Sequence, residues 1–333
     1  MHGKAKEQAE IEGEKELIET STVQAMGKNK YGNVITEELQ NELQGKATVK
    51  KIRKKIVVTI NDSQRSYYVD DEGNVFEYEY VDLAIMENGS DFYNRMSDYR
   101  ESILTVSVLD NMNVPENAYR VFDVSKDQNE TVKAWLVENA ENTDMYDLYI
   151  GSKEGVKAPK SCYGMFTDMN NCKLIDLENL YTEDTTDFIF MFGNCKKLEE
   201  IKNIEYIDTS NVTSIQGMFG YCYLLKNINL VNFDTKKVSN MIETFINCTS
   251  LEELDLSTWN TENVTNTRAM FKGCINLKTI YVSDKWNNDK VTISNDMFDN
   301  CQHLVGKINY DSTKTDIAYA NYDTGYFTYK NYE

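Results

Sequence analysis

Five cysteines recur at one position of a repeated motif, where a thiol could be a metal ligand, a redox centre, a disulfide partner or a core residue. The motif is exemplified by MFKGCINL at 270–277, and its cysteines are Cys195, Cys222, Cys248, Cys274 and Cys301. Zinc sites usually draw ligands from paired C-x-x-C spacings, and this sequence has no such pair. Met169 holds the same position in the first repeat, where it can pack but cannot form a disulfide. We therefore predict that the cysteines are structural core residues, with no metal and no cofactor.

No catalytic group of residues is predicted elsewhere. The chain has only two histidines, His2 and His303, and His303 is expected in an exposed position without an acid to orient it. Phosphate-binding, dinucleotide-binding and H-E-x-x-H motifs are absent from the sequence. The segment 123–134 alternates oxygen side chains as a calcium loop does, but Gln128 replaces the required glycine and Ala134 the bidentate glutamate. We interpret this segment as a polar turn.

The charge balance restricts the classes of partner. Asp and Glu number 54 against 35 Lys and Arg, which gives a net charge of −19. Nucleic-acid phosphates and anionic membrane surfaces both attract cationic proteins, so neither is an expected partner. The sequence also lacks an apolar stretch of the ~18 residues that a membrane helix needs.

A repeat of 26 or 27 residues occupies the second half of the chain. Its anchors are Phe166, Phe192, Phe219, Phe245, Phe271 and Phe298. Apolar residues follow at fixed offsets, so that a typical unit has the pattern F-x-x-C-x-x-L-x-x-L-x-L. This spacing is typical of a leucine-rich repeat in which each L-x-L is a short stacked strand. The pattern predicts a β-solenoid of about six coils, although IKNIEYI at 201–207 carries one extra residue.

The first half has other periodicities. Residues 4–44 predict a long helix, broken near 28–34, with an apolar stripe at Ile11, Ile18 and Ala25. Segments rich in β-branched and aromatic residues then predict a small antiparallel β-meander at 55–61, 65–70 and 74–80. We expect a further helix at 81–100, strands within 102–160, and either a strand or a short helix at 131–140. The 102–160 segment would cover the first repeat, whose open end would otherwise expose core residues.

The repeat resembles a known family. The motif DTSNVT…MF..C..L..LDLS is similar to the BspA-like leucine-rich repeats of bacterial surface proteins. The preceding segments VKAW, LYIGSKEGVKAP and CYGMF resemble that family's entry into its first repeat, and ANYDTGYFTYK at 320–330 resembles its closing segment. The resemblance implies a cell-surface, extracellular location.

The N-terminal segment resembles a different family. GKAKEQAEIEGEKELIETSTVQAM followed by a β-meander is similar to the stalk of type IV pilin-like proteins (prepilins), just after their membrane helix. That apolar helix is not in this sequence, so we expect membrane contact only through a missing N-terminal helix. The expected domains are a pilin-like helix and meander at 1–100, an N-terminal cap at 101–160, and a BspA-like repeat region with its C-terminal cap at 161–333.

One column of residues is a candidate binding surface. The middle residue of each L-x-L faces outward because strand side chains alternate, and the column comprises Asp176, Lys202, Asn229, Asp255 and Tyr281. Repeat proteins usually bind partners on such extended faces. We therefore expect a non-enzymatic surface protein for adhesion or recognition of a protein or glycan. The alternatives are a structural, pilus-associated subunit without a dedicated ligand, or an enzyme with a site within 81–160.

Overall fold

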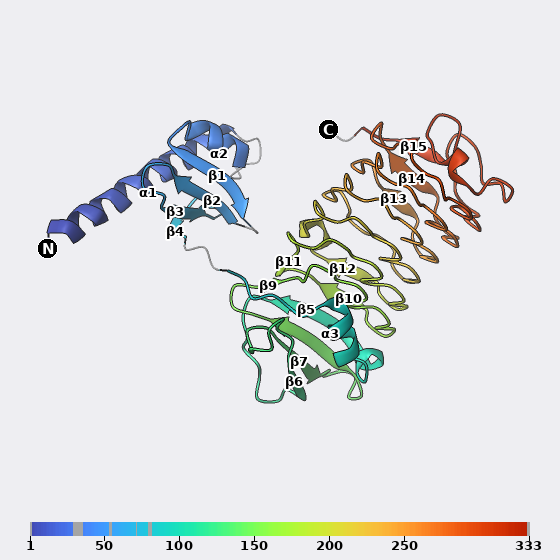
Figure 1. Ribbon diagram of the computed structural model, residues 1–333, viewed down its shortest axis with the longest axis horizontal. Helices are drawn as coiled ribbons and strands as arrows, with labels where there is room; N and C mark the ends of the chain where they lie inside the picture. The colour runs from blue at the N-terminus through green and yellow to red at the C-terminus, as the bar shows by residue number, and fades with distance from the viewer. Residues whose placement is uncertain (1, 29–35, 53–54, 71, 79–81, 332–333) are drawn as a thin grey trace. The chain divides into compact units, whose positions relative to one another are not determined.

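The computed structural model describes residues 2–28, 36–52, 55–70, 72–78 and 82–331 (Figure 1). The chain divides into two compact units, Met1–Asp82 and Leu83–Glu333, which are described separately. Within the described residues, it contains three α-helices and fifteen strands, and the strands form four separate sheets.

The first unit packs two helices on a four-stranded antiparallel sheet. Its elements are α1 (His2–Lys28), α2 (Thr36–Glu42), β1 (Ala47–Ile52), β2 (Lys55–Ile60), β3 (Ser66–Val69) and β4 (Val75–Glu77), with sheet order β1-β2-β3-β4. The helix and meander agree with the sequence prediction, although β1 was not expected. The predicted break at 28–34 falls almost entirely outside the described residues. Ile18 and Ala25 of the apolar stripe are buried in this unit's core.

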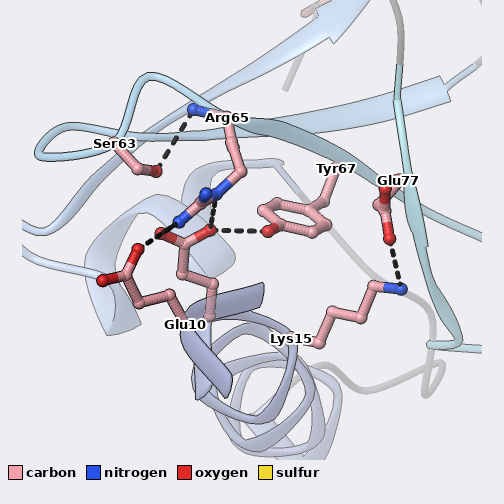
Figure 2. A network of polar contacts seen from close by, with 7 residues as sticks. Glu10, Lys15, Ser63, Arg65, Tyr67 and Glu77 are labelled. Atoms are coloured by element: carbon pink, nitrogen blue, oxygen red, sulfur yellow. Dashed lines mark hydrogen bonds and ion pairs between the residues drawn. The ribbon is translucent and has the colours of Figure 1, made fainter. Parts of the chain in front are cut away.

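A polar network joins α1 to the sheet within this unit (Figure 2). Arg65 on the loop before β3 donates to both carboxylate oxygens of Glu14, at 2.9 and 3.1 Å. The hydroxyl of Tyr67 donates to Glu14 at 2.5 Å, and Lys15 pairs with Glu77 at 3.1 Å. The hydrogen bonds from Arg65 and Tyr67 outweigh the effect of burial and lower the pKa of Glu14 to about 2. The network therefore holds the helix in a defined position on β3 and β4.

The second unit begins with a six-stranded sheet of order β12-β10-β5-β8-β7-β6. Its strands are β5 (Ile103–Leu109), β6 (Arg120–Asp123), β7 (Lys133–Glu138), β8 (Tyr146–Gly151), β10 (Leu174–Asp176) and β12 (Glu200–Lys202). The ambiguous segment 131–140 thus contributes a strand. The predicted helix at 81–100 is much shorter, since α3 covers only Gly89–Arg95 and a 3₁₀ turn follows at Arg100–Ser102. Strand β5 lies beside β10, so the segment before the repeats does pair with the first one.

From residue 161 to 304 the chain stacks its repeats, and we call this segment the repeat stack. Parallel bridges link successive repeats in the series Ser161, Asp187, Ser214, Asn240, Asn266 and Ile293. The anchor phenylalanines are buried and stack face to face, with 5.4–5.8 Å between successive ring centroids. The offset of 26 or 27 residues therefore brings equivalent side chains directly above one another.

The prediction of a leucine-rich repeat β-solenoid is nevertheless wrong, because no sheet runs through the stack. The L-x-L strands are divided between the six-stranded sheet, through β10 and β12, and a separate three-stranded sheet. That second sheet contains β13 (Glu253–Asp255), β14 (Thr279–Val282) and β15 (Phe327–Tyr329), while β9 (Val156–Lys157) and β11 (Leu180–Tyr181) form a small pair of their own. Residues 226–230, between β12 and β13 along the chain, form no strand.

The chain after β12 departs from the repeat at Asn203. This residue takes the position of the second leucine of L-x-L and has a left-handed backbone, with φ of 62°. A 3₁₀ turn at Ile204–Tyr206 follows directly. Strand β12 itself has the same length and ends at the same motif position as β10 and β13, so the pairing is missing on the side of residues 226–230.

Candidate binding surface

The repeated cysteines lie in the core and are not positioned for chemistry. All five are 0% exposed, and all seven cysteines of the chain are free thiols. Each repeated thiol donates to the carbonyl oxygen of the anchor phenylalanine one repeat earlier, at 3.0–3.2 Å, as Cys195 does to Phe166. Burial raises the pKa of Cys222 and of Cys274 to about 12. A thiol with such a pKa is a poor nucleophile and a poor metal ligand at neutral pH.

The other sequence candidates for chemistry are also engaged locally. His303 is exposed, and its Nδ1 lies 2.6 Å from the carbonyl oxygen of Ile275 in the preceding repeat. Asp123, in the loop that partly matches a calcium site, accepts hydrogen bonds from the amides of Ser125 and Glu130 at 3.0 Å each. Within the described residues, no group of three His, Cys, Asp or Glu side chains could hold a metal ion.

The predicted surface column is split into two parts. Asp176 and Lys202 are paired in register on β10 and β12. Asp255 and Tyr281 are paired in register on β13 and β14, whereas Asn229 lies in no strand. The structure thus does not bring these five residues together on one sheet.

The second part of the column contacts the C-terminal end of the chain. Lys330 donates to the carboxylate of Asp255 and lies over the ring of Tyr281, 5.3 Å from its centroid. Partial burial acts to raise the pKa of Asp255, but hydrogen bonds from Lys330 and Ser257 outweigh it and hold the pKa below its usual range. Intramolecular contacts therefore occupy these two side chains.

The first part of the column borders an open groove. The groove has a volume of about 880 Å³ and lies between β12 with its following turn and the unpaired segment of the next repeat. Its lining residues are Glu199, Glu200, Ile201, Lys202, Asn203, Glu205, Lys226, Asn227, Ile228 and Asn229. We call it the β12 groove. Its volume lies within the range of about 300–1,000 Å³ that is usual for ligand sites.

Backbone hydrogen bonding shows why the groove is open. Among the described residues, the backbone of Lys226 to Asn229 makes no hydrogen bond to another backbone group. In the earlier repeat the equivalent segment is paired, since the amides of Glu199 and Glu200 donate to the carbonyl oxygen of Lys173. The β12 groove therefore exposes backbone groups that a complete sheet would have paired.

Five charged side chains surround these backbone groups. Glu199, Glu200 and Glu205 provide carboxylates, and Lys202 and Lys226 provide ammonium groups. Within the part of the chain that the structure describes, none of the five forms an ion pair within 4.0 Å. Their charges are thus available to a partner.

A second, smaller hollow lies elsewhere on the repeat stack. It has a volume of about 500 Å³ and is lined by Thr167, Asp168, Phe190, Gly193, Asn194, Lys196, Tyr221 and Tyr223. Tyr221 and Tyr223 pack edge to face, with ring centroids 6.3 Å apart. This hollow is more aromatic than the β12 groove.

Sequence reasoning identified Lys202 and Asn229 but missed the groove between them. The nearby irregularities in the sequence are the extra residue of IKNIEYI and Asn203, which replaces an apolar residue of the repeat. The next repeat keeps Ile228 and Leu230 yet forms no strand at 226–230, so the apolar pattern gave no signal for the groove.

Comparison with known proteins finds one family. A family model described as "Mycoplasma protein of unknown function, DUF285" matches residues 160–281 and 222–324. The repeat stack is thus similar to a surface-repeat family of the BspA-like kind, as its motif indicated; the pilin-like resemblance of the first unit gains no support from this match. No curated protein and no solved structure matches the chain. Among the described residues, no helix combines the length and apolar character that crossing a membrane requires.

Proposed function

We propose that this chain is a non-enzymatic bacterial cell-surface protein that recognises a protein or a glycan through the β12 groove and the adjoining residues of β10 and β12. The observation that carries the proposal is the interrupted sheet, which leaves charged side chains and backbone groups together in one concavity. Binding sites are typically concave with a few converging polar groups. The surface location rests on the BspA-like resemblance of the repeats.

Contacts in the 81–160 region favour binding over catalysis. The buried carboxylate of Glu87 is held by two hydrogen bonds from Arg95, each 2.7 Å long. Both oxygens of this carboxylate are thus engaged by one side chain of the same region. The reactive groups of the repeat stack are buried thiols with raised pKa values. These features support a recognition role.

Binding assays on the whole chain test this proposal. Pulldown against host matrix proteins and a glycan array should give at least one ligand for the native protein. The double variant Glu200→Ala with Asn229→Ala should weaken binding of that ligand at least tenfold. The matched variant Glu141→Ala with Asn113→Ala changes the same residue types at exposed positions outside the groove and should bind normally. A blank result in both screens would contradict the proposal.

A structural, pilus-associated role is the second candidate, and the first part of α1 favours it. Residues 4–10 of this helix are exposed, and the start of α1 extends beyond the sheet of its own unit (Figure 1). The resemblance of this segment to a pilin-like stalk implies that the helix would anchor or assemble the protein. Cross-linking through a cysteine introduced at Gln8 would give oligomers if α1 assembles in this way, while the control variant Gln64→Cys would not.

A further inference from the structure

We infer that the β12 groove binds an extended peptide segment of net positive charge, which adds to the free edge of β12 as a parallel or antiparallel strand. The inference rests on the proposed function and names the class of partner for the same site. It follows from the direction of the backbone groups, the local chain geometry and the charges around the groove.

The free edge of β12 is defined by its bonds to β10. The amide of Glu200 donates to Lys173, and the carbonyl of Lys202 accepts from Leu177, so both residues direct their backbone toward β10. Successive residues of a strand direct their backbone groups to opposite sides. The amide and carbonyl of Ile201 therefore face the groove, and the described residues provide them with no backbone partner.

The chain itself does not fill this edge. In a regular stack, residues 227–229 would lie in register beside β12, as β12 lies beside β10 with Ile201 opposite Ile175. Residues 226–230 of the next repeat form no strand, and among the described residues 226–229 make no backbone hydrogen bond to β12. Free strand edges readily accept another strand, and recognition by strand addition uses main-chain hydrogen bonds for affinity and side-chain pockets for specificity. An extended peptide can provide main-chain hydrogen bonds to Ile201 and place its side chains among the charged residues of the groove.

The charges select among peptides. Three carboxylates and two ammonium groups line the groove, and none of the five is paired among the described residues. The surrounding chain carries a net charge of −19. Complementary charge speeds association and disfavours wrong partners. A peptide with several lysines or arginines, alternating with β-branched residues that suit an extended backbone, fits the site.

The test uses a fluorescein-labelled eight-residue peptide in which lysine alternates with valine or threonine. Fluorescence anisotropy with the full chain should show saturable binding of this probe. The same peptide with glutamate in place of lysine should bind at least tenfold more weakly. Two further peptides carry N-methyl groups on alternate backbone amides, in one register or the other. A strand pairs through one edge, so one methylated peptide should lose binding at least tenfold and the other should retain it.

Matched variants of the chain separate the groove from general charge effects. The triple variant Glu199→Gln, Glu200→Gln and Glu205→Gln should weaken binding of the basic probe at least fivefold. A control triple variant changes Glu116, Glu138 and Glu141 to Gln at exposed positions outside the groove, alters the net charge equally, and should leave binding unchanged. Hydrogen exchange at the Ile201 amide should slow at least tenfold on peptide addition, while exchange at Ile280 in β14 should not change.

The outcomes distinguish this inference from the proposed function. Equal binding of both methylated peptides, or equal loss in the two triple variants, would overturn strand addition. If the basic peptide fails to bind but a glycan binds and is lost in Tyr221→Ala, the smaller aromatic hollow is the site and the inference is wrong, while surface recognition survives. If matrix proteins, glycans and peptides all fail to bind, the proposed function fails as well.

Discussion

The guanidinium group of Arg100 donates a hydrogen bond to the carbonyl oxygen of Met165 at 3.1 Å. This bond replaces one that the backbone of a preceding repeat would have provided. One repeat later, the equivalent oxygen of Met191 accepts a hydrogen bond from the amide of Phe166. The repeat stack begins near Met165, so no earlier amide can serve its oxygen. A second guanidinium nitrogen donates to the carbonyl of Thr167 at 2.6 Å. One side chain thus satisfies two backbone groups at the first end of the stack.

Replacing this side chain should destabilise the second unit. Arg100 is 3% exposed, and burial lowers its pKa to about 10, which leaves it charged at neutral pH. Arg100→Met would remove the donor from the buried carbonyl oxygen of Met165 and from the part-buried carbonyl oxygens of Thr167 and Tyr93, at about 1–3 kcal/mol for a buried unsatisfied group. We expect the free energy of unfolding to fall by about 2–4 kcal/mol. Urea denaturation followed by tryptophan fluorescence would measure it, since all three tryptophans lie in the second unit.

A surface arginine provides the control. Arg268 pairs with Glu243 at 2.6 Å, but its side chain is 44% exposed. Surface ion pairs contribute about 0–1 kcal/mol, so Arg268→Met should have little effect. Similar losses in the two variants would show that Arg100 does not have the capping role described here.

The cysteines should be unreactive in the folded protein. Cys222 and Cys248 are fully buried, and burial raises the pKa of each thiol. Because the thiolate is the reactive form, Ellman's reagent at pH 8 should label neither residue within an hour. In 6 M guanidinium all seven cysteines should react rapidly. Rapid labelling of Cys222 or Cys248 without denaturant would mean that they do not belong to the core.

The first unit should lose stability in acid because of Glu14. Its pKa is about 2 in the folded chain against an ordinary value of 4.5. A carboxyl group whose folded pKa is depressed stabilises the fold above its unfolded pKa, and this contribution is lost as the pH falls toward the folded value. We therefore expect the protection factors of the α1 amides, which correct hydrogen exchange for its intrinsic pH dependence, to fall progressively between about pH 5 and pH 2.

Two substitutions separate this effect from general acid sensitivity. Glu14→Gln cannot accept a charge-assisted bond from Arg65, so its α1 amides should exchange faster at pH 6 and change less between pH 5 and pH 2. Glu7→Gln alters an exposed residue of the same helix and should retain the native profile. An unchanged profile in Glu14→Gln would exclude the Glu14–Arg65 pair as the cause.

The spacing of apolar residues in the sequence predicted which side chains of α1 and of the repeats are buried. The seven-residue stripe placed Ile18 and Ala25 on the buried face of α1, and the 26-residue period placed the anchor phenylalanines in one core. Strand β1 was missed because ATVKKI has two lysines among its six residues, which weakens the alternation of a half-buried strand. Residue patterns therefore identified the buried faces more reliably than they identified every strand of the sheet.

The continuity of the sheet could not be predicted in the same way. Backbone hydrogen bonds between neighbouring repeats depend on the φ and ψ angles of single residues. The spacing of apolar side chains in the sequence does not determine those angles. Lys202 and Asn229 occupy equivalent positions in the motif, yet one is in a strand and the other is not. The candidate surface was thus predicted as one column, while the groove arises from the break in that column.

The left-handed turn that follows β12 can be tested at Asn203. Its φ of 62° lies in the left-handed region, which glycine adopts freely and asparagine tolerates, whereas β-branched residues are strained there. Asn203→Gly should therefore change the free energy of unfolding by less than about 1 kcal/mol, while Asn203→Val should lower it by about 1–3 kcal/mol. Thermal unfolding of the two variants would measure the difference. Asn203 also donates to Asp176 at 2.7 Å, and both variants lose that bond, so their comparison isolates the backbone. Equal stability of the valine and glycine variants would show that the left-handed turn does not require Asn203.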